Sequence, residues 1–285
     1  MTIATAHTTI TPAYIQLNAE NPKSLSEFYI ENIGLTLIDE DLEHQTYQLG
    51  SDKDNLLLEI SPATDLNKKK SAGLYHFAFL LPNRSDLGEI LRSFIAKQVP
   101  LQGASDHGYS EAIYLQDPEG NGIEIYWDKP RMEWDIKDNG EIQGVTLVMD
   151  AQGVLASAEK PFLKLPTESK MGHFHISIPD LDQSSEFYQT YLGLGKKHTI
   201  PDNAVFLASG NYHHHLGTNN WFGRMLEARK PGQKGLGLLA WHANVHDFEY
   251  IKSQLETDQI PFTSDENSLT VDDPFGITHK IIKEK

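Results

Sequence analysis

The fold is decided by GLYHFAFLLP at residues 73–82 and by ASDHGYSEAIYLQDPEGNGIEIYW at residues 104–127, with a segment of helical periodicity between them. The nearly unbroken apolar run around His76 predicts a well-buried strand, and the alternation around Glu124 predicts a second strand. DPEGN, at 117–121, is a strong turn signal between two of these strands. The stretch therefore predicts a strand, a helix and three further strands.

Two titratable residues, His76 and Glu124, fall on these strands. Side chains alternate between the faces of a strand, so His76 shares a face with Ala78 and Leu80. An ionised carboxylate on the inner face of a sheet is unfavourable unless it is paired or bound to a metal. Taken singly, Glu124 also fits a solvent-facing carboxylate and His76 a hydrogen-bonded core histidine. Taken together, the two residues favour a site for a divalent metal.

Composition limits the possible functions. The chain has 285 residues, enough for about two domains. It has no cysteine, which excludes disulfides, thiolate metal ligands and a cysteine nucleophile. Its net charge is −16 and its main basic run is Lys68–Lys70, which argues against nucleic acid and anionic membranes as partners. No apolar run is as long as the roughly 18 residues of a spanning helix, and we expect a cytoplasmic protein.

The strand–helix–strand pattern occurs four times. FYIENIGL at 28–35 matches FYQTYLGL at 187–194, an offset of 159 residues. DPEGNGIEI at 117–125 matches DPFGITHKI at 273–281, an offset of 156 residues. Repeats of this size indicate duplicated structure. We therefore predict an α+β fold of four βαβββ units, numbered one to four along the chain.

The units fall into two halves. We predict a first domain at 10–128, an ordered connector at 129–168 and a second domain at 169–285. The connector is predicted to hold a short strand at 145–149 and a short helix at 152–159. Helices are predicted at 22–34, 85–97, 182–192 and 247–259, and the fourth strand of unit three at 211–216.

The motifs resemble a known family. The βαβββ repeat, the FY-x4-LG helix ends and the DP-x-G-x3-E strand end are similar to the vicinal oxygen chelate superfamily. That group includes glyoxalase I, extradiol dioxygenases and bleomycin-resistance-type binding proteins. LYHFAFLLP, MGHFHISIPD and NYHHHLGTNNW resemble its two-domain catechol-2,3-dioxygenase-like branch. The resemblance covers nearly the whole chain and implies curled sheets that pair into two open-barrel modules.

The resemblance also implies a ligand set. An extradiol-type site takes a histidine from the first strand of each of two paired units and a glutamate from the last strand of one of them. Carried over by position, these residues are His173 in unit three, and His76 and Glu124 in unit two.

Units one and four lack this set. The first-strand positions fall on Tyr14 and near Ala240, and the glutamate position falls on Lys280. A complete set exists only when unit two pairs with unit three, so we predict this pairing. Units one and four then pair into a module without a metal.

Other residues receive roles from the same resemblance. The run His213–His215 is predicted to lie on a strand, and His214 is expected to be a fourth metal ligand or an acid/base at the substrate. His107 resembles the histidine beyond the ligand set in extradiol enzymes, with two more residues between it and the glutamate. Tyr109 is expected to orient an aromatic ring. No residue is assigned to an organic cofactor.

The function expected from the resemblance is an Fe(II)-dependent extradiol dioxygenase that cleaves a catechol-type ring with dioxygen. One alternative is a glyoxalase-type lyase or isomerase using Zn(II), Mn(II) or Ni(II), which a fourth protein ligand would favour. Another is a noncatalytic small-molecule-binding protein of the resistance type. The expected partners are a small aromatic substrate and dioxygen, and a homo-oligomer is compatible with the sequence.

Overall fold

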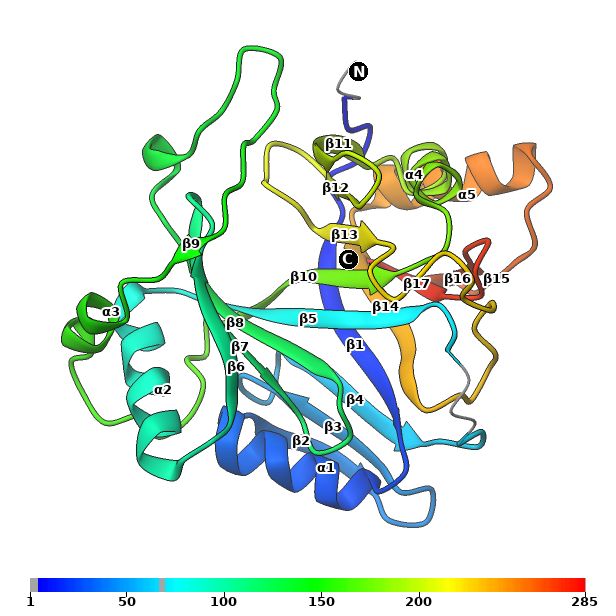
Figure 1. The fold of residues 1–285 in the computed structure, drawn as a ribbon. Coiled ribbons are helices and arrows are strands. Elements are labelled where there is room, and N and C mark those ends of the chain that lie inside the picture. The colour runs from blue at the N-terminus through cyan, green and yellow to red at the C-terminus, as the bar shows by residue number, and fades with distance from the viewer. Residues whose placement is uncertain (1–4, 67–69, 285) are drawn as a thin grey trace.

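The computed structural model describes residues 5–66 and 70–284, so Lys68 and Lys69 of the lysine run lie outside the described residues. Two mixed sheets dominate the molecule, and the helices lie toward its periphery (Figure 1). The 1–4 sheet has the strand order β15-β16-β17-β14-β1-β4-β3-β2. The 2–3 sheet has the order β11-β12-β13-β10-β5-β8-β7-β6-β9. The predicted α+β fold of βαβββ units is confirmed.

Units one and four build the 1–4 sheet. Their elements are β1 (Thr11–Ala19), α1 (Pro22–Phe28), the π-helix η1 (Tyr29–Ile33), β2 (Thr36–Asp41), β3 (Thr46–Gly50), β4 (Leu56–Pro62), β14 (Gly235–Ala243), α5 (Val245–Thr257), β15 (Phe262–Ser264), β16 (Ser268–Asp272) and β17 (Thr278–Lys283). Gly34, just past η1, has a φ of 79° and takes the left-handed conformation that glycine adopts readily.

Units two and three build the 2–3 sheet. Their elements are β5 (Gly73–Leu81), α2 (Arg84–Lys97), β6 (Leu101–Asp106), β7 (Ser110–Gln116), β8 (Gly122–Asp128), β10 (Lys170–Ser177), α4 (Leu181–Thr190), β11 (Gly195–Ile200), β12 (Ala204–Ala208) and β13 (Leu216–Asn219). The connector holds the 3-10 helix η2 (Arg131–Glu133), β9 (Leu147–Val148) and α3 (Ala151–Ser157). The short strand and helix predicted there are present, and β9 extends the edge of the 2–3 sheet.

Unit two pairs with unit three and unit one with unit four, as predicted from the units that lack ligand residues. β10 of unit three pairs antiparallel with β5 of unit two, and β1 of unit one pairs antiparallel with β14 of unit four. Each sheet therefore takes strands from both sides of the connector. The division into 10–128 and 169–285 follows the order of the repeats, and whether either range folds alone stays a prediction.

A repeated tyrosine–aspartate hydrogen bond joins consecutive units across the two sheets. The Tyr29 hydroxyl of unit one donates to Asp117 Oδ2 of unit two at 2.8 Å. The Tyr188 hydroxyl of unit three donates to Asp273 Oδ2 of unit four at 2.7 Å. These residues come from the two repeated motifs, FY and DP. These hydrogen bonds thus join unit one to unit two and unit three to unit four, while the sheets join unit one to unit four and unit two to unit three.

The main core lies between the sheets and their helices, and each concave face carries a smaller cluster of its own. Helix α2 shows how the pattern works, because Leu87, Ile90, Leu91 and Phe94 are buried as its periodicity predicts. Ile95, near the end of the helix, is 56% exposed.

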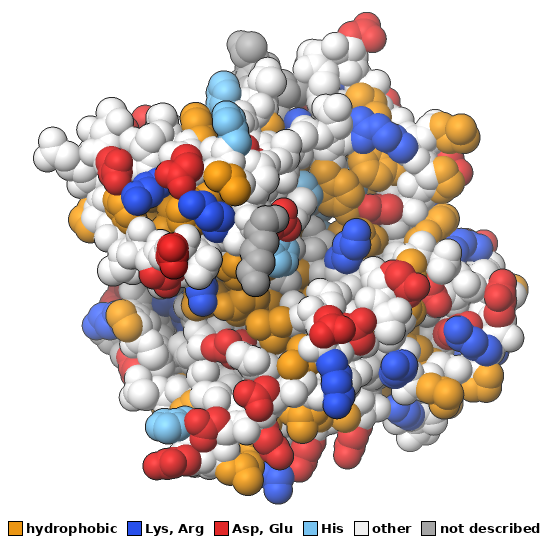
Figure 2. Space-filling model, turned by 180° about the vertical axis from the view of Figure 1, so that it is seen from behind, with side chains coloured by type: hydrophobic (Ala, Val, Ile, Leu, Met, Phe, Trp, Pro, Cys, Tyr) orange, Lys and Arg blue, Asp and Glu red, His pale blue; other side chains and the backbone are white. Residues whose placement is uncertain are grey.

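The surface carries the excess of acidic residues. Figure 2 shows the side opposite to Figure 1, where acidic and basic side chains are interspersed rather than gathered into one basic field. Within the described ranges, no helix combines the length and the apolar character needed to cross a bilayer.

Candidate metal centre

The strand register of the 2–3 sheet brings the predicted ligands together. His173 on β10 lies opposite Ala78 on β5, and Ala78 lies opposite Glu124 on β8. The small side chain of Ala78 leaves room for its two neighbours to approach each other above β5. His76 lies two residues before Ala78 and shares its face, as the alternation predicts.

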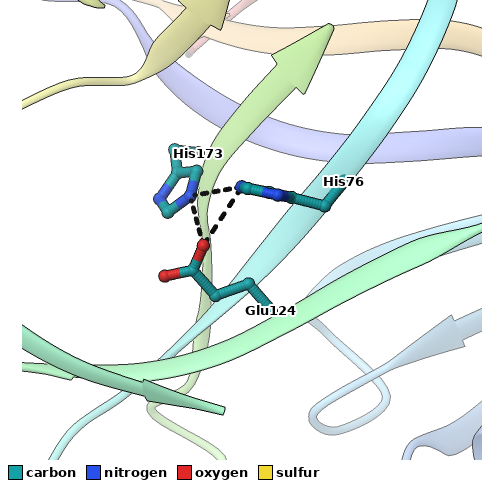
Figure 3. A group of neighbouring side chains, drawn as sticks. All are labelled: His76, Glu124 and His173. Carbon is teal, nitrogen blue, oxygen red and sulfur yellow. Dashed lines mark hydrogen bonds and ion pairs between the residues drawn. The ribbon is translucent and has the colours of Figure 1, made fainter. Parts of the chain in front are cut away.

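The three side chains meet at one point (Figure 3). Glu124 Oε2 lies 3.1 Å from His76 Nε2 and 3.2 Å from His173 Nε2, and the two nitrogens are 3.3 Å apart. Two ligands bound to one ion at about 2.1 Å are about 3.0 Å apart at right angles and about 3.4 Å apart in a tetrahedron. The observed spacings fall between these values. The donor set therefore fits a single divalent ion, and it is the one group of its kind among the described residues.

Burial and charge set the protonation of the group. Burial by itself would raise the pKa of Glu124, but the adjacent His173 and His76 hold it well below its usual range. Burial lowers the pKa of His173 to about 4, against the opposing effect of Glu124. A deprotonated carboxylate and a neutral imidazole are the forms that bind a metal. His173 Nδ1 is buried, and no described residue offers it a hydrogen bond.

Tyr114 links the centre to His107. It lies opposite Glu124 in the β7–β8 pair, and its hydroxyl is 2.6 Å from His107 Nε2. The carbonyl of Val145 accepts from His107 Nδ1 at 2.8 Å, so in the neutral ring Nε2 is left to accept from Tyr114. Burial and the negative charge of Glu124 raise the pKa of Tyr114 well above its usual range. The hydroxyl therefore stays protonated.

The prediction that His213–His215 lie on a strand is wrong. The run forms bends before β13, which begins at Leu216, and all three residues are buried. Strand alternation consequently does not decide which side chain faces the site.

Hydrogen bonds fix the orientation of the His213 and His214 side chains instead. Asp128 accepts from His213 Nε2 at 3.0 Å, and His213 Nδ1 lies 2.8 Å from His214 Nδ1. When both rings are neutral, His213 Nδ1 accepts, His214 Nδ1 carries the proton, and His214 Nε2 is a free base.

The other predicted site residues lie around His76, Glu124 and His173, which we call the triad. The His214 ring is 4.2 Å from the His173 ring, but His214 is not part of the close ligand group, so a role as fourth ligand stays a prediction. The Tyr109 ring stacks on His213 at 4.2 Å with an interplanar angle of 11°. Burial and the nearby carboxylates raise the pKa of Tyr109 above its usual range. His107 reaches the triad through Tyr114.

Two residues escaped the sequence reasoning. Tyr114 was within reach, because Tyr114 and Glu124 are equally distant from the centre of the DPEGN turn, and hairpin pairing places them opposite each other. His175 received no role from the sequence. It is 3% exposed beside His76, with ring centroids 4.9 Å apart.

The 1–4 sheet shows what the same positions look like without ligands. Gln16 on β1 lies opposite Leu238 on β14, as His175 lies opposite His76. Leu238, rather than a residue near Ala240, therefore corresponds to His76. His76 and Glu124 are 48 residues apart and Leu238 and Lys280 are 42 apart, so counting along the chain does not fix this position in unit four. Tyr14 and Lys280 take the places of His173 and Glu124.

A family model agrees with this architecture. Residues 11–125 match the Glyoxalase/Bleomycin resistance protein/Dioxygenase superfamily. A relative that is 31% identical over 265 residues extends the similarity to 92% of this chain. The chain belongs to this superfamily.

The relative just mentioned is a catechol-2,3-dioxygenase of Bacillus subtilis (strain 168), and 93% of its length is covered. Among solved structures, a putative dioxygenase from Bacillus subtilis subsp. subtilis str. 168 superimposes with a TM-score of 0.65 at 13% identity, covering 98% of this chain and 86% of the other. Glyoxalase I from Zea mays superimposes with a TM-score of 0.58 at 15% identity, covering 97% and 93%. The two structural similarities show the fold alone.

Proposed function

We propose that the chain is an extradiol dioxygenase that opens the ring of a catechol-type substrate with dioxygen. The observation that carries the proposal is the convergence of His76, His173 and Glu124, whose ligand atoms all lie within 4.8 Å of one another. The 31% identity to a catechol-2,3-dioxygenase along nearly the whole chain supports the same activity. Two histidines and one carboxylate are the protein ligands typical of non-haem Fe(II) oxygenases.

The proposed cofactor is one Fe(II) ion held by His76 Nε2, His173 Nε2 and Glu124 Oε2. Such an ion, with three protein ligands, supplies positions at which a diol and dioxygen bind side by side. The three ligand atoms lie 3.1–3.3 Å apart. The protein keeps Glu124 ionised and His173 neutral over the physiological range.

His214 is the proposed base for the substrate hydroxyl. Its Nδ1 proton is directed to His213, which is anchored on Asp128, so its Nε2 can accept a proton. Burial and the neighbouring imidazoles lower the pKa of His214 well below its usual range, which keeps the ring in its neutral form. Tyr109 holds the orientation of His213 by stacking on it.

Tyr114 and His107 are proposed to position the opposite side of the centre. The Tyr114 hydroxyl is protonated, lies next to Glu124 and donates to His107 Nε2, so its oxygen can accept a hydrogen bond from a substrate hydroxyl at the ion. His107 fixes that hydroxyl through its Nε2 and is itself held by the Val145 carbonyl. A direct contact of His107 or Tyr109 with substrate is not needed in this arrangement.

The test is anaerobic purification, loading with Fe(II), and addition of catechol and air. We expect a yellow ring-opened product that requires both the metal and dioxygen, with one dioxygen consumed per catechol. Turnover of a glyoxalase hemithioacetal substrate with Zn(II), Mn(II) or Ni(II), and none of catechol, would support the lyase instead. Tight catechol binding without product would support a binding protein.

A further inference from the structure

His175 on β10 is the next inward-facing residue after His173, and its Nε2 has no partner. The side chain is 3% exposed, and no described residue forms a hydrogen bond with this nitrogen. Buried polar atoms are almost always hydrogen-bonded, and an unpaired one destabilises the folded chain. The placement is thus unfavourable for the protein alone and calls for a partner that is not part of the chain.

The 1–4 sheet provides an internal comparison. There Gln16 takes the place of His175, and its Nε2 donates to Glu59 Oε1 at 2.7 Å from the neighbouring strand. In the 2–3 sheet the position next to His175 is Gly217. A Cβ on Gly217 would lie 2.9 Å from the imidazole, so a side chain there would displace the ring. One sheet supplies a partner for this position, and the other has a glycine that makes room for the ring.

Aromatic side chains surround His175 on the remaining sides. Its ring centroid is 5.2 Å from both Tyr75 and Trp221 and 5.7 Å from Phe206. Trp221 is 44% exposed, so this wall reaches the surface. Two residues along a strand span about 6.6 Å, which is close to the width of a substituted benzene ring. His175 is therefore about one ring away from His173 and directly beside His76.

We propose that His175 is a specificity-determining residue whose Nε2 hydrogen-bonds a polar substituent on the ring of a catechol held at the metal centre, with Tyr75 and Trp221 as the aromatic wall. The proposal rests on the proposed function. It goes further in naming the substrate class, catechols with a hydroxyl or similar polar group next to the diol, rather than catechols with an alkyl group there.

The test is anaerobic equilibrium binding of two probes of nearly equal shape, pyrogallol and 3-methylcatechol, to the Fe(II)-loaded protein. We expect His175→Phe and His175→Leu to raise the Kd for pyrogallol by about tenfold, the value of one hydrogen bond, and to change the Kd for 3-methylcatechol by less than about threefold. Gln16→Leu, the matched change on the 1–4 sheet, is expected to alter neither. Equal changes for the two probes, or none, overturn the proposal.

Thermal unfolding of the metal-free protein is the second readout. Because the variants remove an unpaired buried nitrogen, we expect the Tm of His175→Phe or His175→Leu to hold or to rise by about 2–4 °C. A fall of that size in both variants would mean that the protein itself satisfies the imidazole and would overturn the inference. If the wild-type protein binds neither probe, the proposed function fails, and this inference fails with it. If the wild-type protein binds both probes and the variants show the same ratio of Kd values for the two probes, only this inference fails.

Discussion

The 1–4 sheet and the 2–3 sheet share a strand order but differ in the chemistry of their concave faces. Where the 2–3 sheet has His173, His76 and Glu124, the 1–4 sheet has Tyr14, Leu238 and Lys280. The apolar cluster on the 1–4 face includes Tyr14 and Leu238. Backbone geometry therefore does not create the candidate site, because the same geometry occurs twice and carries the ligands once.

The difference also shows why the site needs both halves of the chain. His76 and Glu124 come from unit two, and His173 comes from unit three beyond the connector. The tyrosine–aspartate bonds hold consecutive units, and the sheets join the inner pair and the outer pair. A ligand set divided between units two and three is compatible with the fold only through this exchange.

The largest effect is expected when a ligand of the 2–3 sheet is replaced by the residue type at the equivalent position of the 1–4 sheet. His76→Leu places the Leu238 residue type in the 2–3 sheet. We expect ring cleavage to fall to background, a loss of more than about a hundredfold, since even a residue beyond the ligands contributes about 10–100-fold. The reciprocal change Leu238→His should leave turnover at the wild-type level. Activity assays with circular dichroism as the folding control check both, and an active His76→Leu variant would contradict the ligand assignment.

A smaller effect is expected at Tyr114. Tyr114→Phe removes the hydroxyl between Glu124 and His107, and we expect activity to fall by about 10–100-fold while the metal is retained. Thr270 lies opposite Lys280 as Tyr114 lies opposite Glu124, so Thr270→Val is the matched control and should have no effect. Steady-state kinetics with metal analysis decide the outcome. Full activity in Tyr114→Phe would remove the positioning role.

The sequence predicted the fold and the close approach of His76, Glu124 and His173, and their role as metal ligands stays a prediction. The repeats mark supersecondary units, and two incomplete ligand sets in consecutive units leave one complete combination, His173 with His76 and Glu124. Alternation placed His76 and Ala78 on one face, as the structure shows. These inferences combine the local periodicity of the sequence with the ligand pattern that the family resemblance implies.

The rest depended on tertiary detail. His213–His215 were placed on a strand because short polar runs between apolar residues do not distinguish a strand from a bend. The predicted position near Ala240 was two residues away from Leu238 because unit four is shorter than unit two between these positions, 42 residues against 48. The unpaired nitrogen of His175 depends on Gly217 of a neighbouring strand, a relation that only register reveals.

A buried histidine of the 1–4 sheet should make the stability of the protein depend on pH. His279, behind the 1–4 sheet, accepts from Trp241 Nε1 at Nδ1 and lies near the Tyr188 hydroxyl. Burial lowers its pKa from 6.5 to about 3. Below pH 6.5 the unfolded chain binds this proton and the folded chain does not, so the free energy of unfolding falls as pH falls, by up to about 1.4 kcal/mol per pH unit.

Urea unfolding of the metal-free protein at pH 7, 6 and 5 measures this slope. His279→Gln should lose less stability than the wild type between pH 7 and 5, by about 2 kcal/mol. Asp273, whose burial raises its pKa to about 6, acts in the opposite sense in both proteins. Identical slopes in the two proteins would show that His279 is not buried in its neutral form.

The smallest effect is expected on the concave face of the 1–4 sheet. Tyr14 is 7% exposed, and burial together with Glu59 raises its pKa to about 12. Tyr14→Phe should leave metal content unchanged and shift the free energy of unfolding by less than about 1 kcal/mol. Metal analysis and urea unfolding check this. Loss of the ion in Tyr14→Phe would indicate a metal on the 1–4 sheet and would contradict its assignment to the 2–3 sheet.

The most direct measurement is an anaerobic Fe(II) titration by calorimetry of the wild type beside two carboxylate variants, one from each concave face. Glu124→Ala removes the carboxylate of the triad, and Glu59→Ala removes the carboxylate that accepts from Gln16 on the 1–4 sheet. The account predicts one ion per chain in the wild type and in Glu59→Ala, and none in Glu124→Ala. An ion retained by Glu124→Ala, or lost from Glu59→Ala alone, would contradict it.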